Sequence, residues 1–182
     1  MIKTYVFGKD RKLERNVACI GYFDGVHRGH QLLIKKAVEE ANKKGVKPYL
    51  ITFKPDPYEV ITKKKAENIN SFNKRLKLFE QFGIKGVIII PFDEELMKMN
   101  KDEFYEKVLK KLNNETLVCG EDFTYAYKGQ GKAKDLKKKQ DVIIVESLNY
   151  YGKKISSTRI KKALKEGKIS LANKMLGYEY QK

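Results

Sequence analysis

The fold of this 182-residue chain is decided by residues 21–30, Gly-Tyr-Phe-Asp-Gly-Val-His-Arg-Gly-His. An apolar run at residues 17–20 predicts a buried strand before it, and apolar side chains at helical spacing predict a helix over residues 31–41 after it. Glycines let a ligand approach the backbone closely, and the free N–H groups at a helix N-terminus bind phosphate. His27 and His30 are three residues apart, so both would lie on one face of the first helical turn. The stretch therefore predicts a phosphate-binding turn with two imidazoles directed at a phosphoryl oxygen.

The rest of the chain alternates between apolar runs and helical patterns. Further strands are expected at residues 47–53, 87–90, 116–119 and 141–145, and further helices at residues 73–82, 101–112, 157–164 and 170–176. About five strands separated by helices predict an α/β fold, a Rossmann-like doubly wound parallel sheet with flanking helices. In such sheets ligands bind beyond the carboxyl ends of the strands. Because four polar loops follow strand ends, we expect one site built from residues 21–30, 53–58, 91–95 and 120–131.

Composition narrows the classes of function. The net charge is +16, but lysines are spread along the chain and arginine, which suits bidentate contacts to bases and phosphates, is scarce. We therefore expect a solvated basic surface and no nucleic-acid partner. Cys19 and Cys119 are far apart, with no Cys-x-x-Cys or His-Glu-x-x-His pattern, so no metal ion bound by protein side chains is expected.

No apolar stretch approaches the roughly 20 residues that span a bilayer. The first residues, Met-Ile-Lys-Thr-Tyr-Val-Phe-Gly, lack the apolar core and cleavage site of a signal peptide. These features predict a cytoplasmic protein without a membrane partner.

Residues 21–30 resemble the H-x-G-H signature of the nucleotidylyltransferases. The form G-x-F-D-G-V-H-x-G-H is most similar to the FMN adenylyltransferase (FAD synthetase) family. The resemblance implies that His27 and His30 are catalytic. It also implies an ATP-binding role for a set of residues in the same turn, Gly21, Phe23, Asp24, Gly25 and Gly29.

Two further segments resemble the flavin side of that family. Thr-Phe-Lys-Pro-Asp-Pro at residues 52–57 is similar to T-F-x-P-x-P, and residues 120–126 are similar to G-x-D-F-x-F-G. The FMN-binding residues that the resemblance implies are Phe53, Pro55, Pro57, Asp122 and Phe123. Four positions depart from the family pattern: Lys54, Asp56, Tyr125 and Ala126. Since alanine resists a positive φ, we expect the turn at Ala126 to differ from the glycine turn of the family.

A third segment, Ile-Ser-Ser-Thr-Arg-Ile-Lys at residues 155–161, resembles I-S-S-T-x-I-R. The resemblance implies that Ser157 and Thr158 bind ATP and that Arg159 is catalytic. The residues alone leave a second reading open, because Ser157 or Thr158 would also serve as the N-cap of the following helix.

The resemblance implies the reaction ATP + FMN → FAD + pyrophosphate, with Mg²⁺ bound through the ATP phosphates. It covers nearly the whole chain, so the expected domain is a single adenylyltransferase domain, residues 1–182, without the riboflavin kinase barrel of bacterial members. Two alternatives stay open: a nucleotidylyltransferase with another acceptor, such as phosphopantetheine or a cytidylyl acceptor, and a non-catalytic flavin- or RNA-binding module. The oligomeric state stays undetermined.

Overall fold

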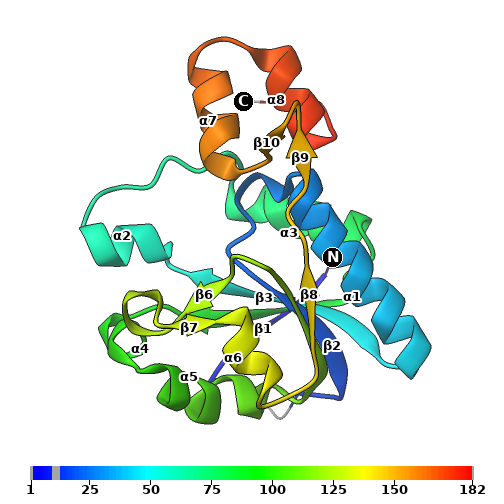
Figure 1. The fold of residues 1–182 in the computed structure, drawn as a ribbon, viewed down its shortest axis with the longest axis vertical. Helices are drawn as coiled ribbons and strands as arrows, with labels where there is room; N and C mark the ends of the chain where they lie inside the picture. The colour runs from blue at the N-terminus through cyan, green and yellow to red at the C-terminus, as the bar shows by residue number, and fades with distance from the viewer. Residues whose placement is uncertain (1, 10–12, 182) are drawn as a thin grey trace.

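The computed structural model describes residues 2–9 and 13–181. The two ends of the expected domain, residues 1 and 182, lie outside the described residues. Within the described part, a six-stranded parallel sheet runs through the centre in the order β1-β4-β3-β2-β5-β8 (Figure 1). Its strands are β1 (Lys3–Val6), β2 (Asn16–Ile20), β3 (Lys47–Lys54), β4 (Gly86–Pro91), β5 (Asn114–Gly120) and β8 (Val142–Val145).

Helices and short 3₁₀ segments connect these strands. The helices are α1 (Arg28–Lys44), α2 (Pro57–Thr62), α3 (Phe72–Gln81), α4 (Glu94–Lys98), α5 (Lys101–Lys107), α6 (Ala133–Lys137), α7 (Ser157–Lys165) and α8 (Ile169–Leu176). The 3₁₀ segments are η1 (Asp24–Val26), η2 (Leu109–Leu112) and η3 (Tyr127–Gly129). Two antiparallel hairpins complete the fold: β6 (Thr124–Tyr125) pairs with β7 (Gly131–Lys132), and β9 (Asn149–Tyr150) pairs with β10 (Lys153–Lys154). The expected helix over residues 101–112 is thus α5 followed by a separate 3₁₀ turn.

Both faces of the sheet are covered. Cys19 of β2 and Val118 of β5 are fully buried on the face of α1 and α3. The neighbouring residues Ala18 and Leu117 are fully buried on the opposite face, with α4, α5 and α6. Successive side chains of a strand point to opposite faces, so burial on both faces requires the near-continuous apolar runs seen in the sequence.

The strand order reverses beside β2. From β2 the chain proceeds to β3 and β4 on one side, and β5 and β8 then lie on the other side. The crevice between β2 and β5 is therefore the switch point at which ligands bind in such sheets. The predicted α/β class and doubly wound sheet are confirmed. The strand number was one too low, because the polar and partly exposed residues of β1 do not form an apolar run.

The last two helices, α7 and α8, lie beyond the carboxyl ends of the strands (Figure 1). They form an apolar cluster of their own, which includes Ile160 and Met175. Two hydrogen bonds attach this cluster to the turn and to the start of α1: Tyr178 Oη donates to the Gly25 carbonyl at 2.5 Å, and Gln31 Nε2 donates to the Leu176 carbonyl at 2.7 Å. A third hydrogen bond, from Ser157 Oγ to the Asp24 carbonyl at 2.9 Å, holds the N-terminus of α7 beside the turn.

Candidate active site

The two histidines are brought together by the start of α1. His27 is the N-cap of this helix, and its Nδ1 accepts a hydrogen bond from the backbone N–H of His30 at 3.3 Å. A residue three positions after the N-cap lies over it, and the two imidazole rings stack with centroids 3.6 Å apart and planes 14° apart. A Cβ atom on Gly29 would lie 3.2 Å from the His27 ring. Glycine between the histidines therefore leaves room for the stacked pair.

Both imidazoles are uncharged near neutral pH. Burial lowers the pKa of His27 to about 4. Burial, and then electrostatic repulsion from the neighbouring His27 and Arg75 side chains against a proton on His30, hold the pKa of His30 well below its ordinary value. Because Nδ1 of the neutral His27 accepts a hydrogen bond, its proton must be on Nε2, where it can be donated. His30 Nδ1 is buried and finds no hydrogen-bond partner among the described residues.

We expect the free energy of unfolding to decrease as the pH falls. The pKa of His27 drops from 6.5 to about 4 on folding, so the unfolded chain binds more protons between these values. The stabilisation is complete above about pH 6.5 and is lost as the pH falls through about 4, and at about pH 5 the loss from His27 is on the order of 2 kcal/mol. Urea unfolding at about pH 8 and about pH 5 measures this change in the free energy of unfolding.

The control for this prediction is His27→Asn. Asparagine keeps an N-cap acceptor but does not titrate, so the variant should lose less stability between the two pH values. An equal loss in the variant and the unsubstituted protein would contradict the assignment of the effect to His27.

The turn before the histidines has an unusual backbone. Phe23 and the β-branched Val26 have positive φ angles of 58° and 41°, a region that such residues rarely adopt. Gly25 has φ 76°, and a Cβ atom there would lie 2.8 Å from Ile69. Strain of this kind persists where the surrounding structure over-determines it, and it concentrates at functional sites.

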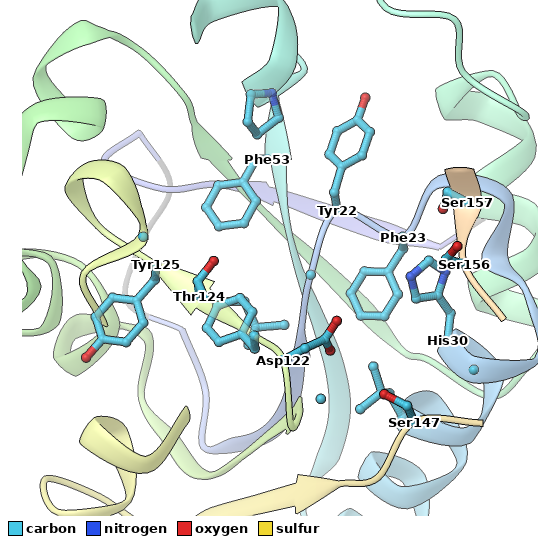
Figure 2. Close-up of a pocket in the computed structure, with 18 of the residues that line it drawn as sticks. Tyr22, Phe23, His30, Phe53, Asp122, Thr124, Tyr125, Ser147, Ser156 and Ser157 are labelled. Atoms are coloured by element: carbon cyan, nitrogen blue, oxygen red, sulfur yellow. The ribbon is translucent and has the colours of Figure 1, made fainter. Parts of the chain in front are cut away.

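A cavity of about 650 Å³ opens at the carboxyl ends of β2, β3, β4 and β5. Figure 2 shows Phe53 and Tyr125 on one side of this main cavity and His30 and Ser157 on the other, with Asp122 between them. All four loops that were expected to form the site contribute to the wall of this one cavity. The volume is typical of small-molecule sites, and one side offers flat apolar rings while the other offers polar groups.

An ion pair lies on the wall of the main cavity. Lys154 of β10 donates through Nζ to the carboxylate of Asp122, which follows β5. The charge of Lys154 also contributes to the low pKa of His27. Lys154 has no separate signal in the sequence, because only the fold brings β10 to the end of β5.

Arg159 is placed differently from the prediction. Its Nη1 donates to the backbone carbonyls of Tyr150, Lys153 and Lys154 at 2.9, 2.7 and 3.3 Å. Arg159 does not belong to the wall of the main cavity among the residues that the structure describes. Its guanidinium instead holds the β9–β10 hairpin, and the cationic side chains on the cavity wall are those of Lys128 and Lys154 in the described part of the chain.

The N-cap of α7 is Ser156, whose Oγ accepts from the Arg159 backbone N–H at 3.2 Å. The alternative in which Ser157 or Thr158 caps the helix is therefore wrong by one residue or more. Ser157 lines the main cavity, whereas Thr158 is exposed and lies outside its wall.

The other predicted site residues also fall into two groups, those on the wall of the main cavity and those outside it. The wall of the main cavity includes Gly21, Phe23, His27, Gly29, His30, Phe53, Pro57, Asp122 and Phe123. It does not include Asp24, Gly25 or Pro55 in the described structure. Wall residues that the sequence did not single out include Ile61 of α2, Leu96 and Met97 of α4, Phe104 of α5, and three residues of the loop after β8, Glu146, Ser147 and Leu148.

Asp24 joins three segments. Its Oδ1 accepts from the backbone N–H groups of Ile69 at 2.8 Å and Asn70 at 3.4 Å, and its Oδ2 pairs with Lys161 Nζ at 2.8 Å. Its backbone carbonyl accepts from Ser157 Oγ at 2.9 Å. The carboxylate is 5% exposed, so these bonds account for its burial. Asp24 acts here as a clamp between the turn, the segment before α3, and α7.

The prediction that Ala126 resists a positive φ is wrong. Ala126 adopts φ 66° and ψ −176°, directly before the 3₁₀ turn η3. The hairpin β6–β7 surrounds it, and the Gly129 N–H donates to its carbonyl at 3.0 Å. Tertiary and hairpin contacts therefore outweigh the local preference of alanine at this position.

Two negative findings apply to residues 2–9 and 13–181 alone. No group of three or more His, Cys, Asp or Glu side chains is placed to hold a metal ion. No helix there has the length and apolar character to cross a membrane.

Comparison with known proteins gives consistent matches. A family model described as FAD synthetase matches residues 9–159. Bifunctional riboflavin kinase/FMN adenylyltransferases of Listeria monocytogenes and Bacillus subtilis are 34% and 36% identical to this chain, over 90% and 91% of its length. Each match covers 54% of the relative, so the chain spans about half the length of these curated relatives.

Solved structures match the fold as well. A crystal structure described as a macrolide-efflux protein from Streptococcus pneumoniae has a TM-score of 0.89 and 28% identity, covering 99% of this chain and 63% of that chain. A pantoate-beta-alanine ligase from Francisella tularensis has a TM-score of 0.54 and 14% identity, covering 100% and 80%, and is similar in fold alone.

Proposed function

Because this chain belongs to the FAD synthetase family, we propose that it transfers the adenylyl group of ATP to FMN, giving FAD and pyrophosphate. The observation that carries the proposal is the stacked, uncharged histidine pair at the N-terminus of α1, on the wall of a cavity that also has an aromatic side.

In the proposed reaction a phosphate oxygen of FMN attacks the α-phosphorus of ATP in line. One P–O bond forms, the bond between the α-phosphorus and the bridging oxygen to the β-phosphorus breaks, and pyrophosphate leaves with the electron pair. No covalent bond to the protein is needed, so positioning and charge stabilisation supply most of the rate enhancement.

The histidines would act as hydrogen-bond donors to the α-phosphate. Nε2–H of His27 is available because Nδ1 is occupied by the His30 backbone. Neutral donors held rigidly by stacking and by a helix cap are pre-organised, and they stabilise the charge that develops on the phosphoryl oxygens. The positive end of the α1 dipole adds to the same effect.

Two lysines would supply the positive charge that the sequence assigned to Arg159. Lys154 reaches the cavity wall, and Lys161 lies one helical turn inside α7, paired with Asp24. Arg159 would act as a positioning residue, since it holds the hairpin that carries Lys154.

The aromatic side of the main cavity suits a flat ring system such as the isoalloxazine of FMN. Phe53 and Phe92 pack edge to face with centroids 5.9 Å apart, and Phe123 stacks on Tyr125 at 6.0 Å. Rigid aromatic walls of this kind bind planar ligands with little loss of side-chain freedom.

Mg²⁺ would enter with the ATP. The acidic residues on the wall of the main cavity are Asp122 and Glu146, and Asp122 is already paired with Lys154. This donor set fits an ion held chiefly by triphosphate oxygens, with at most a carboxylate and water completing its coordination. The bound ion neutralises charge on the phosphates. We place the reaction in the cytoplasm, consistent with the free thiols Cys19 and Cys119.

The test is incubation of the purified chain with FMN, ATP and Mg²⁺, followed by chromatography for FAD and an assay for pyrophosphate. Equimolar FAD and pyrophosphate are expected. A folded protein that forms no FAD would refute the proposal. Thermal shifts with FMN, phosphopantetheine and CTP then distinguish another acceptor or nucleotide, because a ligand that binds the native state raises its melting temperature.

A further inference from the structure

Arg75 of α3 lies in the interior of the protein. It is 4% exposed, and no other lysine or arginine in the described part of the chain is buried to this degree. Helical spacing places it on the face of α3 that also buries Leu78 and Phe79. Removing a guanidinium from water costs free energy unless protein partners replace the water. A charged residue at a core-facing position therefore indicates a role that an apolar residue could not fill.

The partners of Arg75 belong to the turn before the histidines. Its Nη1 donates to the Tyr22 carbonyl at 2.7 Å, and its Nη2 donates to Tyr22 Oη at 3.4 Å. The guanidinium carbon lies 4.5 Å from the centroid of the Tyr22 ring and 5.3 Å from that of Phe72. Among the residues that the structure describes, the buried Nε of Arg75 has no hydrogen-bond partner and no carboxylate pairs with the guanidinium. The contacts of Arg75 are thus directed at Tyr22 and not at an acidic side chain.

Tyr22 connects Arg75 to the histidine pair. Its carbonyl accepts a second hydrogen bond from Thr52 Oγ at 3.3 Å, and the next residue is Phe23 with its positive φ of 58°. The Phe23 ring packs edge-on against His30, with centroids 5.1 Å apart (Figure 2). A peptide held by two donors keeps the following residue in a conformation that it would otherwise leave. Loss of the Arg75 donor would therefore allow Phe23, and with it the His30 ring, to shift.

We propose that Arg75 is a positioning residue for the adenylyl transfer, which fixes the peptide after Tyr22 and thereby the place of the His30 ring. The inference rests on the proposed function for the reaction whose rate it affects. Arg75 does not belong to the wall of the main cavity among the residues that the structure describes, so it acts through Tyr22 and Phe23 and not by touching a substrate. The family resemblance and the comparisons assign no role to it.

The charge of Arg75 acts on the same histidine. The titratable and charged groups around His30 are His27, Arg75, the ion pairs Lys154–Asp122 and Lys161–Asp24, and Glu146 on the same cavity wall. Both lysines have a carboxylate partner, whereas Arg75 has none in the described structure. After burial and His27, the charge of Arg75 contributes to the low pKa of His30. An uncompensated cation behind the pair therefore helps to keep His30 neutral, in the form that can donate to a phosphoryl oxygen.

The kinetic test compares Arg75→Met, Arg75→Lys and the control Arg15→Met. Arg75→Met should lower kcat for FAD formation about 10–100-fold, the scale for a small misplacement of a catalytic group. The KM values for FMN and ATP should change less than about threefold, because uniform binding is not affected. Arg75→Lys keeps a charge and a donor and should restore part of kcat. Arg15 is exposed and pairs with Glu115, so Arg15→Met should resemble the unsubstituted protein.

An NMR titration tests the charge without any assay of activity. The chain has two histidines, so His27→Asn leaves His30 as the single imidazole. In that background, Arg75→Met should raise the pKa of His30, because removing a like charge favours the protonated form. Arg75→Lys should leave this pKa unchanged. If Arg75→Met does not fold, Arg75→Gln, which is uncharged but retains a donor, takes its place with the same expected rise.

The inference is overturned if Arg75→Met turns over as fast as Arg15→Met does. It is also overturned if KM rises as much as kcat falls, because Arg75 would then act on substrate binding. Equal pKa values of His30 in the Arg75→Lys variant and in the uncharged variant would refute the role of the charge. If the unsubstituted protein forms no FAD, the proposed function fails, and the titration of His30 still decides whether Arg75 acts on it.

Discussion

Replacing His30 with Asn is expected to lower kcat for FAD formation about 10²–10³-fold, the usual cost of losing one pre-organised donor to developing charge. His30 lies on the wall of the main cavity and stacks on His27 at 3.6 Å, so its removal takes away a donor and the partner that orients His27. Steady-state kinetics with FMN and ATP measure the effect, and circular dichroism and urea unfolding verify that the variant is folded.

His27→Asn is the matched variant, because asparagine preserves the helix cap that His27 provides. The His27→Asn variant should show a similar decrease in kcat for FAD formation. The double variant should lose little more than either single variant, since residues that act as a unit give non-additive effects. Normal turnover in both single variants would remove the histidine pair from the mechanism.

Asp24→Ala is expected to lower the free energy of unfolding by about 2–4 kcal/mol, because it leaves two buried N–H groups without an acceptor and Lys161 without its counter-ion. Asp24→Asn retains an acceptor at Oδ1, so its free energy of unfolding should decrease by less than that of Asp24→Ala. Urea unfolding at neutral pH measures both.

The control for Asp24 is Asp93→Ala. Asp93 caps α4 by accepting from the Leu96 N–H at 2.8 Å, and the loss of such a cap costs about 1 kcal/mol. If Asp24→Ala lowered the free energy of unfolding by no more than Asp93→Ala does, the role of Asp24 as a clamp between three segments would be contradicted. If ATP affinity fell instead while stability was unchanged, the ATP-binding role that the resemblance implied for Asp24 would hold.

Three features of the site could be read from the sequence because they depend on neighbouring residues. The strand–turn–helix unit around residues 21–30 follows from an apolar run, glycines and helical periodicity. The contact between His27 and His30 follows from the spacing of an N-cap and the third helical residue. The assembly of four loops into one cavity follows from the parallel sheet, since all strand ends meet at one edge.

Other features were decided by tertiary structure, because they depend on competition between partners that are distant in sequence. The Arg159 guanidinium donates to three carbonyls of the β9–β10 hairpin, and it is Lys154 of that hairpin, not Arg159, that lies on the cavity wall. Asp24 is a clamp because the segment before α3 brings it buried N–H donors from 45 and 46 residues away. Which ion pairs form, and which side chains reach the cavity, depend on the groups that the fold brings within a side chain's reach, and the order of residues in the chain does not determine these groups.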